Sequence, residues 1–478
     1  MPNSTYFGSF KHGKLIFGIV ILLIFIALAF RIFLAPIKNI GKDEFVSLHS
    51  SWLISQGKVP YRDFLISYPP TLGIFLYPLF KLFNESIAII FISRYIILFF
   101  DILIAIAVYK IAKEFFDNDI AILSVLALLY EPIFFHKGMQ IRPDVPMTFF
   151  WLISFYLIIK GIDKSKNLFL AGLSLGIGFC FKQYMLIGLL TLLVSVMIYH
   201  KYTGVNGIKR IFTQQFTILV GFSLPLIILL GYLHFNNAMG NFAYLNFKAY
   251  IELTYSHTLY EKIQLFLRKA LIDLFFWGST FFILLIKTND LFKNKLPSKE
   301  IFLLTPFFIF LPAIFLFIYS WEQYYLPLIP IASIYVGLII EKILNIKSGS
   351  FHRYILITFL LVNGILAPMY YMYWWTTQRN YEQIETINYV LSITTPEDCV
   401  FDRMGMYIFR NHAYGHWVIA IPIIRDPGLS KIPKSLEKGQ CKVIIDDGFI
   451  KDLPKNVQDY VGEHYVSTGR YNVLVRKD

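Results

Sequence analysis

The stretch "LIFGIVILLIFIALAFRIFLAP", residues 15–36, decides the fold, because it is one continuous apolar run with a single charged residue. A helix of roughly 20 such residues spans the hydrocarbon core of a bilayer. Directly after it, "NIGKDEFVSLHSSW", residues 39–52, presents two adjacent carboxylates, Asp43 and Glu44. We therefore expect the chain to leave a membrane here and to place two acidic side chains at its edge.

Composition extends this expectation to the whole chain. Of its 478 residues, 56% are hydrophobic and only 16% are charged, whereas about a quarter of a soluble protein is charged. The sequence predicts a polytopic α-helical membrane protein with about eleven transmembrane helices. The predicted spans are 15–36, 87–109, 119–135, 146–161, 167–182, 184–200, 212–234, 266–287, 300–319, 325–341 and 352–375. The proline-broken run 69–83 is too short to span, so it is expected to be interfacial or re-entrant.

The distribution of lysine and arginine predicts the orientation. The formal net charge is +13, but the basic residues lie mainly in short connections on one side of the predicted spans. That distribution indicates a cytoplasmic N-terminus and excludes a nucleic-acid partner. The loops 35–86 and 136–146 and the tail from about Gln378 then lie outside the cell membrane.

The tail differs in kind from the rest of the chain. It is less apolar, has strand-like pieces at 399–404, 441–446 and 471–476, and has a helical pattern just before them. About 100 residues suffice for a small domain. We expect a transmembrane domain over 1–377, with the acidic motif in its outer loop 37–86, and a small soluble α/β domain over 378–478. Its two cysteines, Cys399 and Cys441, could form a disulfide or remain thiols.

Ionisable residues at membrane depth usually face a cavity or a partner, so the few present form a short list of candidates. Asp43 and Glu44 could be a charged cap where the chain leaves the bilayer, or catalytic carboxylates. Arg142 and Asp144 lie at the same predicted outer face, where Asp144 alone could be a helix N-cap. Lys182 lies in a tight outer link, where it could extend to the interface or bind phosphate.

Two further sets complete the list. Arg94 and Asp101 are seven residues apart on one predicted helix, so they lie on one face about two turns apart and could form a buried structural pair. The outer loop 320–330 carries Gln323, Tyr324 and Tyr325, which suit a sugar or a lipid headgroup or an interfacial aromatic belt. The sequence has no nucleotide-binding glycine motif, so an inside-facing nucleotide sugar is not the expected donor.

Five segments resemble one known family. "KDEFVSLHSSWLISQGKVPYRDFLISYPPTLGIFLYPLFKLF" (42–83) resembles the first outer loop of the GT-C membrane glycosyltransferases, above all glycosyltransferase family 39. "SRYIILFFDILIAIAVYKIAKEFF" (93–116) is similar to that family's arginine-led second span. "IRPDVPMTFFWLISFYLI" (141–158) resembles its second outer loop, "AGLSLGIGFCFKQYML" (171–186) its lysine segment, and "QYYLPLIPIASIYVG" (323–337) its YxLPxxP span. Family 39 includes protein O-mannosyltransferases and lipid A aminoarabinose transferases.

The resemblance implies an inverting glycosyltransferase of the cell envelope. It implies a polyprenyl-phosphate sugar donor and a lipid, glycan or protein acceptor at the outer face. Asp43 is then the general base, Glu44 supports it or orients the acceptor, and Asp144 positions a cation or contacts the sugar. Arg142, Lys182 and Arg94 are expected at the phosphate. The family often has a lysine before Pro-Pro, where this chain has Tyr68; Lys58 or Arg62 would substitute.

Two alternatives use the same residues differently. A transporter or flippase of lipid-linked glycans would also need charged groups in a cavity, although the sequence lacks the paired halves common in transporters. A non-catalytic membrane scaffold would bind partners through its tail. Some GT-C enzymes use a divalent metal, which Asp43 with Asp144 could hold, but nothing in the sequence requires a metal or any other cofactor.

Overall fold

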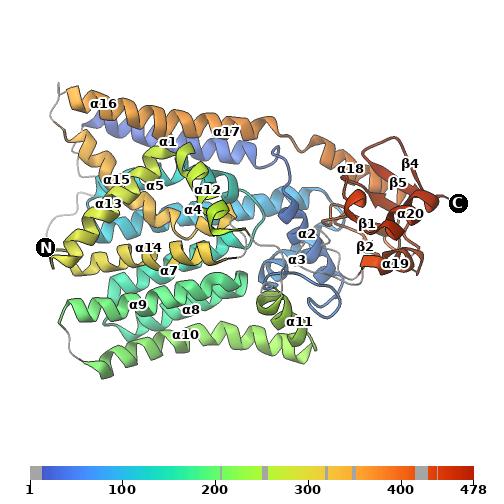
Figure 1. Cartoon of the computed structure of the whole chain (residues 1–478), viewed down its shortest axis with the longest axis horizontal. Coiled ribbons are helices and arrows are strands. Elements are labelled where there is room, and N and C mark those ends of the chain that lie inside the picture. Colours follow the sequence, from blue (N-terminus) through green and yellow to red (C-terminus); the bar gives the residue numbers. More distant parts are fainter. Residues whose placement is uncertain are drawn as a thin grey trace.

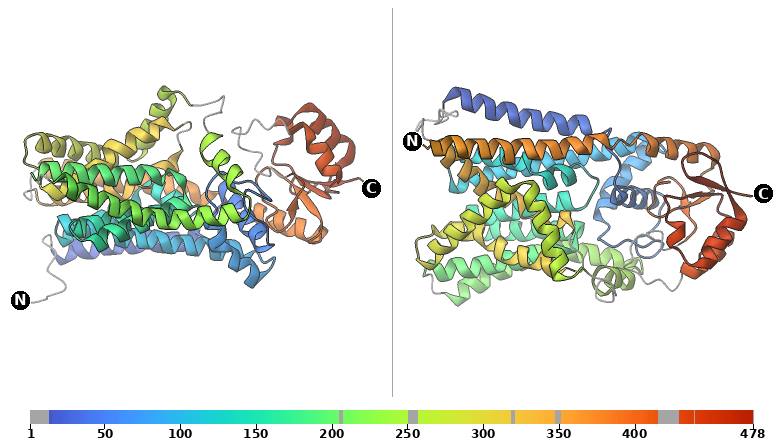
Figure 2. Two further views of the ribbon diagram at one scale, coloured as in Figure 1. Left: turned by 90° about the horizontal axis from the view of Figure 1, so that it is seen from below. Right: turned by 45° about the horizontal axis from the view of Figure 1, so that its top comes forward.

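The structure is a computed structural model, and it describes residues 13–204, 207–249, 257–317, 321–346, 351–414, 429–438 and 440–477. Long helices lie side by side along the long axis of the molecule, and a small sheet domain lies beyond one end of them (Figures 1 and 2). By length and composition, seven helices in the described part could cross a membrane, or up to nine if each of two bent pairs is one span. The chain is a polytopic α-helical membrane protein.

The helices that form the bundle follow the apolar runs of the sequence. They are α1 (Lys14–Leu34), α4 (Ala88–Phe115), α5 (Asn118–Tyr130), α6 (Pro132–Gly138), α7 (Asp144–Gly161), α8 (Ser165–Phe181), η1 (Gln183–Met185), α9 (Leu186–Tyr202), α10 (Ile208–Phe235), α12 (Leu259–Ile272), α13 (Leu274–Phe292), η3 (Ser298–Glu300), α14 (Ile301–Leu316), α15 (Ile329–Leu344), α16 (Phe351–Phe359), η5 (Leu360–Leu366) and α17 (Ala367–Thr377). Each of the eleven predicted spans falls on one or more of these helices.

Two predicted spans each fall on a pair of helices that meet at a sharp bend. The prediction for 266–287 was wrong in its first part, because α12 continues to Ile272 and meets α13 at 110°. Asp273 lies at the break, and its carboxylate accepts a 3.0 Å hydrogen bond from the backbone N–H of Phe276, which caps α13. The predicted span 119–135 bends by 68° at Glu131, where Pro132 starts α6.

A layer of short elements separates the bundle from the sheet domain. It contains α2 (Lys42–Ser55), α3 (Thr71–Phe83), α11 (Met239–Ala243), η2 (Tyr244–Lys248) and η4 (Glu322–Tyr325). Figure 1 shows α2, α3 and α11 between the bundle and the sheet domain. The segment expected to be interfacial, 69–83, is α3, which has 13 residues and is interrupted by Pro78. α2 carries Asp43 and Glu44 in its first turn.

The sheet domain has the order β2-β1-β3-β5-β4. β2 and β3 run parallel to β1, with Val400 opposite His412 and Val443, whereas β5 runs antiparallel to both β3 and β4. The three strand-like pieces of the sequence are β1, β3 and β5. The elements are α18 (Tyr381–Ile393), β1 (Cys399–Phe401), β2 (Asn411–His412), η6 (Leu429–Lys431), α19 (Ile432–Lys438), β3 (Val443–Ile445), η7 (Ile450–Asp452), α20 (Lys455–His464), β4 (Tyr465–Ser467) and β5 (Val473–Arg476).

A loop of the sheet domain, residues 402–410, docks on the layer of short elements. Asp402 shapes this loop by accepting hydrogen bonds from three successive backbone N–H groups, those of residues 404–406. Arg410 then pairs with Glu85 at 2.6 Å, just after α3. Ile408 and Phe409 are fully buried in the same core as the bundle. Cys399 and Cys441 are both buried, and they do not form a disulfide with each other.

A buried ion pair joins two helices of the bundle. Asp101 of α4 lies 3.1 Å from Arg31 of α1, and neither side chain is exposed. The prediction that Asp101 pairs with Arg94 is wrong: positions seven apart are separated by roughly 10 Å along a helix axis, and each of the two has a partner on another element. Arg94 pairs with Glu44 instead.

Candidate active site

Four charged side chains form a chain of alternating sign where α2, α7 and α8 meet. Asp43 contacts Nη1 of Arg142 through its carboxylate. Nε of Arg142 lies 3.3 Å from Oδ2 of Asp144, and Nζ of Lys182 lies 3.7 Å from the same oxygen. The structure thus brings together four predicted site residues that lie up to 139 positions apart in the sequence. We call Asp43, Arg142, Asp144 and Lys182 the charge chain.

Asp144 faces the charge chain and does not cap its helix. It is the first residue of α7, one position after the N-cap, which is Pro143. The carboxylate is fully buried, and Oδ1 accepts a hydrogen bond of 3.2 Å from the hydroxyl of Tyr184. The alternative that Asp144 serves as a simple N-cap is therefore excluded. Tyr184 was missed by the sequence analysis, although it stands two residues after Lys182 in the same link.

Asp43 is the most accessible member of the charge chain. Its side chain is 49% exposed, while those of Arg142, Asp144 and Lys182 are 7%, 0% and 14% exposed. Partial burial alone would raise the pKa of Asp43, but the positive charges of Arg142 and Lys182 outweigh it and lower that pKa. The site therefore presents a half-exposed, ionised carboxylate that contacts a buried guanidinium.

Lys182 lies in a cradle of aromatic and hydroxyl groups. Its ammonium is 5.1 Å from the centre of the Tyr68 ring, a cation–π distance. The Tyr68 hydroxyl lies 3.2 Å from Oγ of Ser47, one turn after Asp43 on α2. Burial lowers the pKa of Lys182, although Asp144 opposes this effect. Tyr68, the residue before Pro69, thus contacts a lysine that comes from another element.

Glu44 and Arg94 are paired behind the site and are not open to it. Both carboxylate oxygens of Glu44 contact Arg94, at 2.7 and 2.9 Å. The same oxygens accept hydrogen bonds from the backbone N–H groups of Gly41 and Ile141. Arg94 donates in addition to three backbone carbonyls, those of Ala35, Lys38 and Asn39. All five N–H groups of a guanidinium are then engaged. The pair fastens the start of α2 to α4 and to the loop that carries Arg142.

Glu322 is the centre of a second polar cluster nearby. Its carboxylate lies 3.4 Å from Nδ1 of His136 and 3.6 Å from Nζ of Lys137, and it also pairs with Lys269. Burial alone would raise the pKa of Glu322, but these neighbours lower it. The sequence analysis singled out the loop 320–330 for its polar groups. The residue of this loop that forms ion pairs is Glu322.

The remaining predicted residues are divided between the site and its surroundings. Tyr324 packs against Tyr184 with ring centres 5.6 Å apart, and the backbone carbonyl of Gln323 accepts a hydrogen bond from Tyr184. Tyr325 is buried against Phe266 and Trp277, away from the charges. Arg62 pairs with its neighbour Asp63. Lys58 is exposed, and in the described part neither Lys58 nor Arg62 forms a hydrogen bond or ion pair with the charge chain.

A cavity opens directly from Lys182. It measures about 1010 Å³ out to its open mouth. Among the described residues that line it, Lys182 is the one charged side chain, and Gln183, Tyr184 and Asn246 add polar groups near it. The rest of the wall is apolar or aromatic, formed by Leu186, Ile187, Phe247, Leu316, Phe317 and Tyr324. The cavity can thus hold an anionic group at Lys182 and an apolar chain along its wall.

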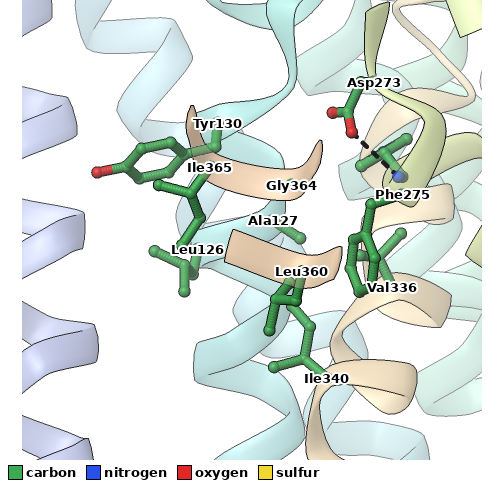
Figure 3. A pocket seen from close by; sticks show the side chains of 11 residues that line it. Leu126, Ala127, Tyr130, Asp273, Phe275, Val336, Ile340, Leu360, Gly364 and Ile365 are labelled. Carbon is green, nitrogen blue, oxygen red and sulfur yellow. Dashed lines mark hydrogen bonds between the residues drawn. The ribbon is translucent and has the colours of Figure 1, made fainter. Parts of the chain in front are cut away.

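A smaller cavity within the bundle lies apart from these charges. It measures about 400 Å³ and lies between α5, α13, α15 and η5, with mostly apolar lining residues that include Leu126, Val336 and Leu360 (Figure 3). Among the described residues that line it, Asp273 is the one acidic residue, and its carboxylate caps α13, as the dashed line in Figure 3 shows. This cavity shares no lining residue with the one at Lys182.

The carboxylates of the site do not fit a divalent metal. Arg142 contacts both Asp43 and Asp144, so a guanidinium already occupies the place between the two carboxylates that a cation would need. Lys182 is a further cation on Asp144. Among the described residues, no group of three or more histidine, cysteine or acidic side chains is arranged to hold a metal ion.

Comparisons with known proteins find a family model that matches part of the chain. Residues 67–231 match the model of the family described as dolichyl-phosphate-mannose-protein mannosyltransferase. No curated protein sequence matches the chain. The matched segment runs from the residue before Tyr68 through α10 and includes Arg142, Asp144 and Lys182.

Solved structures of two membrane proteins are similar over nearly the whole chain. ArnT from Cupriavidus metallidurans, bound to undecaprenyl phosphate, has a TM-score of 0.65 at 13% identity, over 96% of this chain and 98% of that one. Its apo state has a TM-score of 0.67 at 13% identity, over 97% and 98%. The oligosaccharyltransferase from Archaeoglobus fulgidus has a TM-score of 0.60 at 11% identity, over 98% and 74%. These likenesses establish the fold.

Proposed function

We propose that this chain, which has the GT-C fold and resembles glycosyltransferase family 39, transfers a sugar from a polyprenyl-phosphate donor to an acceptor. The reaction takes place at the outer face of the membrane and inverts the anomeric centre. Residues 1–377 form the transmembrane domain with a cytoplasmic N-terminus, and residues 378–478 form an extracytoplasmic domain.

The cavity at Lys182 is the observation that carries this proposal. A polyprenyl phosphate is an anion on a long apolar chain, and this cavity has one lysine at its head and apolar walls beyond it. The family model and ArnT name lipid phosphates of this kind, dolichyl phosphate and undecaprenyl phosphate. Lys182 is also joined through Asp144 and Arg142 to the exposed carboxylate of Asp43. The donor phosphate, at Lys182, and the general base for the acceptor, Asp43, then lie at opposite ends of the charge chain.

The reaction follows from these positions. Asp43 takes the proton of an acceptor hydroxyl as the hydroxyl oxygen attacks the anomeric carbon of the sugar. The bond from that carbon to the phosphate oxygen breaks, and polyprenyl phosphate leaves with the electron pair. Arg142 and Lys182 stabilise the charge that develops on the phosphate, and arginine suits it through its planar fork. Attack from the side opposite the phosphate inverts the anomeric configuration.

Donor binding also activates the base in this mechanism. In the free protein Arg142 lowers the pKa of Asp43, and a carboxylate with a lowered pKa is a weak base. A bound phosphate shares the positive charge of Arg142 and Lys182, so it raises the pKa of Asp43 toward its ordinary value. The carboxylate therefore becomes a better proton acceptor only when the donor is in place.

The other site residues have supporting roles. Asp144 positions Arg142 and Lys182, and Tyr68 holds Lys182 in place. Glu44 supports Asp43 through Arg94, which fixes the start of α2 and does not meet the phosphate. Gln323 and Tyr324 border the sugar, while Lys58, Arg62 and Tyr325 lie outside the reacting atoms.

Donor binding by purified protein tests the role of the cavity. We expect Lys182→Gln to weaken binding of radiolabelled polyprenyl phosphate by about 10- to 100-fold, because a hydrogen bond to a charged group contributes roughly 1.5–3 kcal/mol. Lys160→Gln is the control, since Lys160 lies near the far end of α7, about 24 Å along the helix from Asp144. Equal binding by both variants would show that Lys182 does not bind the donor phosphate.

A further inference from the structure

A second cavity lies on the other side of Asp43, between α2, α18 and the sheet domain. It measures about 780 Å³ out to its open mouth. Lys42 and Phe45 of α2 form one wall, Gln383 of α18 forms another, and Arg403 and Asp446 belong to the sheet domain. Lys42 immediately precedes Asp43, and its ammonium reaches across the cavity to within 3.6 Å of the Asp447 carboxylate.

The sheet places this cavity where α/β domains bind ligands. In open sheets with parallel strands, ligands bind outside the carboxyl ends of the strands. β1 ends at Phe401 and is followed by Asp402, and β3 ends at Ile445 and is followed by Asp446; both aspartates line the cavity. Interfaces between domains are also preferred places for ligand sites.

The lining residues suit a hydroxyl-rich ligand. They mix cationic, acidic, amide and aromatic side chains, so the cavity offers hydrogen-bond donors and acceptors and no single sign of charge. Sugar hydroxyls need both kinds of partner, because each donates and accepts. Arg403 is half-buried, and its guanidinium forms no hydrogen bond or ion pair with the described residues. Its five N–H groups therefore have no partner in the described part of the chain, and a ligand in the cavity can accept hydrogen bonds from them.

We propose that this cavity binds the acceptor of the reaction, and that the acceptor is a glycan whose hydroxyl groups contact Arg403, Asp446 and Asp447. This inference rests on the proposed glycosyltransferase function. The donor then occupies the cavity at Lys182, the acceptor glycan occupies the cavity beside Lys42, and Asp43 lies on the helix turn between them.

The topology argues against an extended peptide in this place. Peptides that bind sheets add as a strand to an exposed edge. The cavity lies at the ends of β1, β3 and β5, which are the interior strands of the sheet, while β2 and β4 are its edges. A peptide paired with either edge would run along the sheet and not into the cavity.

Blocking the cavity chemically tests the proposal and does not require an identified acceptor. The variant Arg403→Cys in the full chain is treated with a bulky methanethiosulfonate, which reaches the new thiol because position 403 is only half-buried and spares the three native cysteines because they are buried. Two rates are measured with the lipid-linked sugar donor: transfer to an acceptor extract from the native envelope, and slow hydrolysis of the donor by water. We expect the ratio of transfer to hydrolysis to fall at least tenfold.

The control is Lys455→Cys, treated in the same way, because Lys455 is an 81% exposed side chain of α20 in the same domain and does not line the cavity. An unchanged ratio in modified Arg403→Cys, or an equal fall in the control, would overturn the proposal. Absence of all donor turnover in the untreated wild type would instead overturn the proposed function, so the two failures are distinguishable.

The class of acceptor is tested with the same extract. A glycan acceptor survives exhaustive proteolysis of the extract and is destroyed by periodate, which cleaves neighbouring diols. We expect transfer by the wild type to persist after protease treatment and to disappear after periodate treatment. Loss of transfer after protease treatment, or its persistence after periodate, would overturn the assignment of a glycan.

Discussion

His49 of α2 and Ile408 of the sheet domain are joined by a hydrogen bond of 2.8 Å between Nδ1 and the backbone carbonyl, although 359 residues separate them. Because a carbonyl only accepts, Nδ1 carries the proton, and Nε2 accepts from the hydroxyl of Tyr407 at 3.2 Å. Ile408 has a φ of 41°, an unfavourable value for a β-branched residue. The sheet domain thus fixes the helix that carries Asp43 through a loop held under strain.

This contact predicts that docking of the sheet domain depends on pH. Burial lowers the pKa of His49 to about 3, whereas a free histidine titrates near 6.5. The undocked protein therefore binds more protons as pH falls below about 6.5, and docking weakens from there toward pH 3. We expect hydrogen-exchange protection of residues 402–410 to fall between pH 7 and pH 5.

The variant His49→Gln isolates the contribution of this one imidazole. Glutamine can still donate to the Ile408 carbonyl but does not titrate, so protection should vary less with pH than in the wild type. His412 also has a pKa lowered by burial, to about 4, and it is present in both proteins, so the difference between them reports on His49. Identical pH dependence in both would contradict this account.

Replacement of Arg142 tests electrostatic stabilisation of the leaving phosphate. Arg142→Gln removes the guanidinium between Asp43 and Asp144 but keeps a polar side chain of similar length. Loss of one donor to a developing charge typically lowers kcat by about 10²–10³-fold. We expect a loss of this size, with partial recovery in Arg142→Lys, measured as steady-state release of polyprenyl phosphate. A fall in kcat of less than about threefold in Arg142→Gln would show that Arg142 does not stabilise the leaving phosphate.

The pH profile of the reaction reports on Asp43. Arg142 and Lys182 outweigh burial and lower the pKa of Asp43, so its carboxylate stays ionised below the ordinary range and is lost only as pH falls through the lowered pKa. The acidic limb of kcat/KM, which reports on the free enzyme, should therefore lie below the ordinary aspartate value near 3.9. In Arg142→Gln this limb should move to higher pH. A limb that stays in place would show that Asp43 is not the titrating base.

The pair formed by Glu44 and Arg94 should matter for stability. Removal of one partner of a buried ion pair costs about 3–5 kcal/mol, because a buried charge is left uncompensated. Arg94→Gln should therefore lower the Tm in detergent far more than Arg210→Gln, whose partner Asp163 is exposed. The double variant Glu44→Gln/Arg94→Gln should be less destabilised than the sum of its two single changes. Additive effects would contradict direct coupling.

The sequence analysis placed Asp43, Arg142, Asp144 and Lys182 at one end of the predicted bundle because these four residues share one property. Asp43, Arg142, Asp144 and Lys182 each stand beside an apolar run at the same predicted face of the membrane. Positions that follow or precede spans on one side must lie at one end of the bundle. Proximity could therefore be inferred without knowing how the helices pack.

The roles of Glu44 and Arg94 could not be predicted in this way. Asp43 and Glu44 are neighbours in the sequence, but successive residues on a helix differ by about 100° in direction. One carboxylate is thus half exposed while the other is buried. Which of them faces inward depends on the rotation of α2, and that depends on packing against α4 and the sheet domain.

The long-range contacts of the sheet domain could not be predicted from the sequence either. The pairing of His49 with Ile408 and of Arg410 with Glu85 joins segments more than 300 residues apart. No local pattern marks either pair. The strands β1, β3 and β5 and the helix α18 were predicted from the sequence pattern, whereas β2 and β4 were not, and the loop 402–410 depends on its docking partner.

The most direct test follows donor turnover. Purified protein in lipid is given a panel of radiolabelled polyprenyl-phosphate sugars with an acceptor extract, and release of polyprenyl phosphate is measured. The wild type is compared with Asp43→Asn and with Asp163→Asn, an exposed carboxylate outside the site. We predict release by the wild type and by Asp163→Asn, and a loss of at least a hundredfold in Asp43→Asn with donor binding retained. Equal turnover by Asp43→Asn, or no release by the wild type with any donor, would contradict the account.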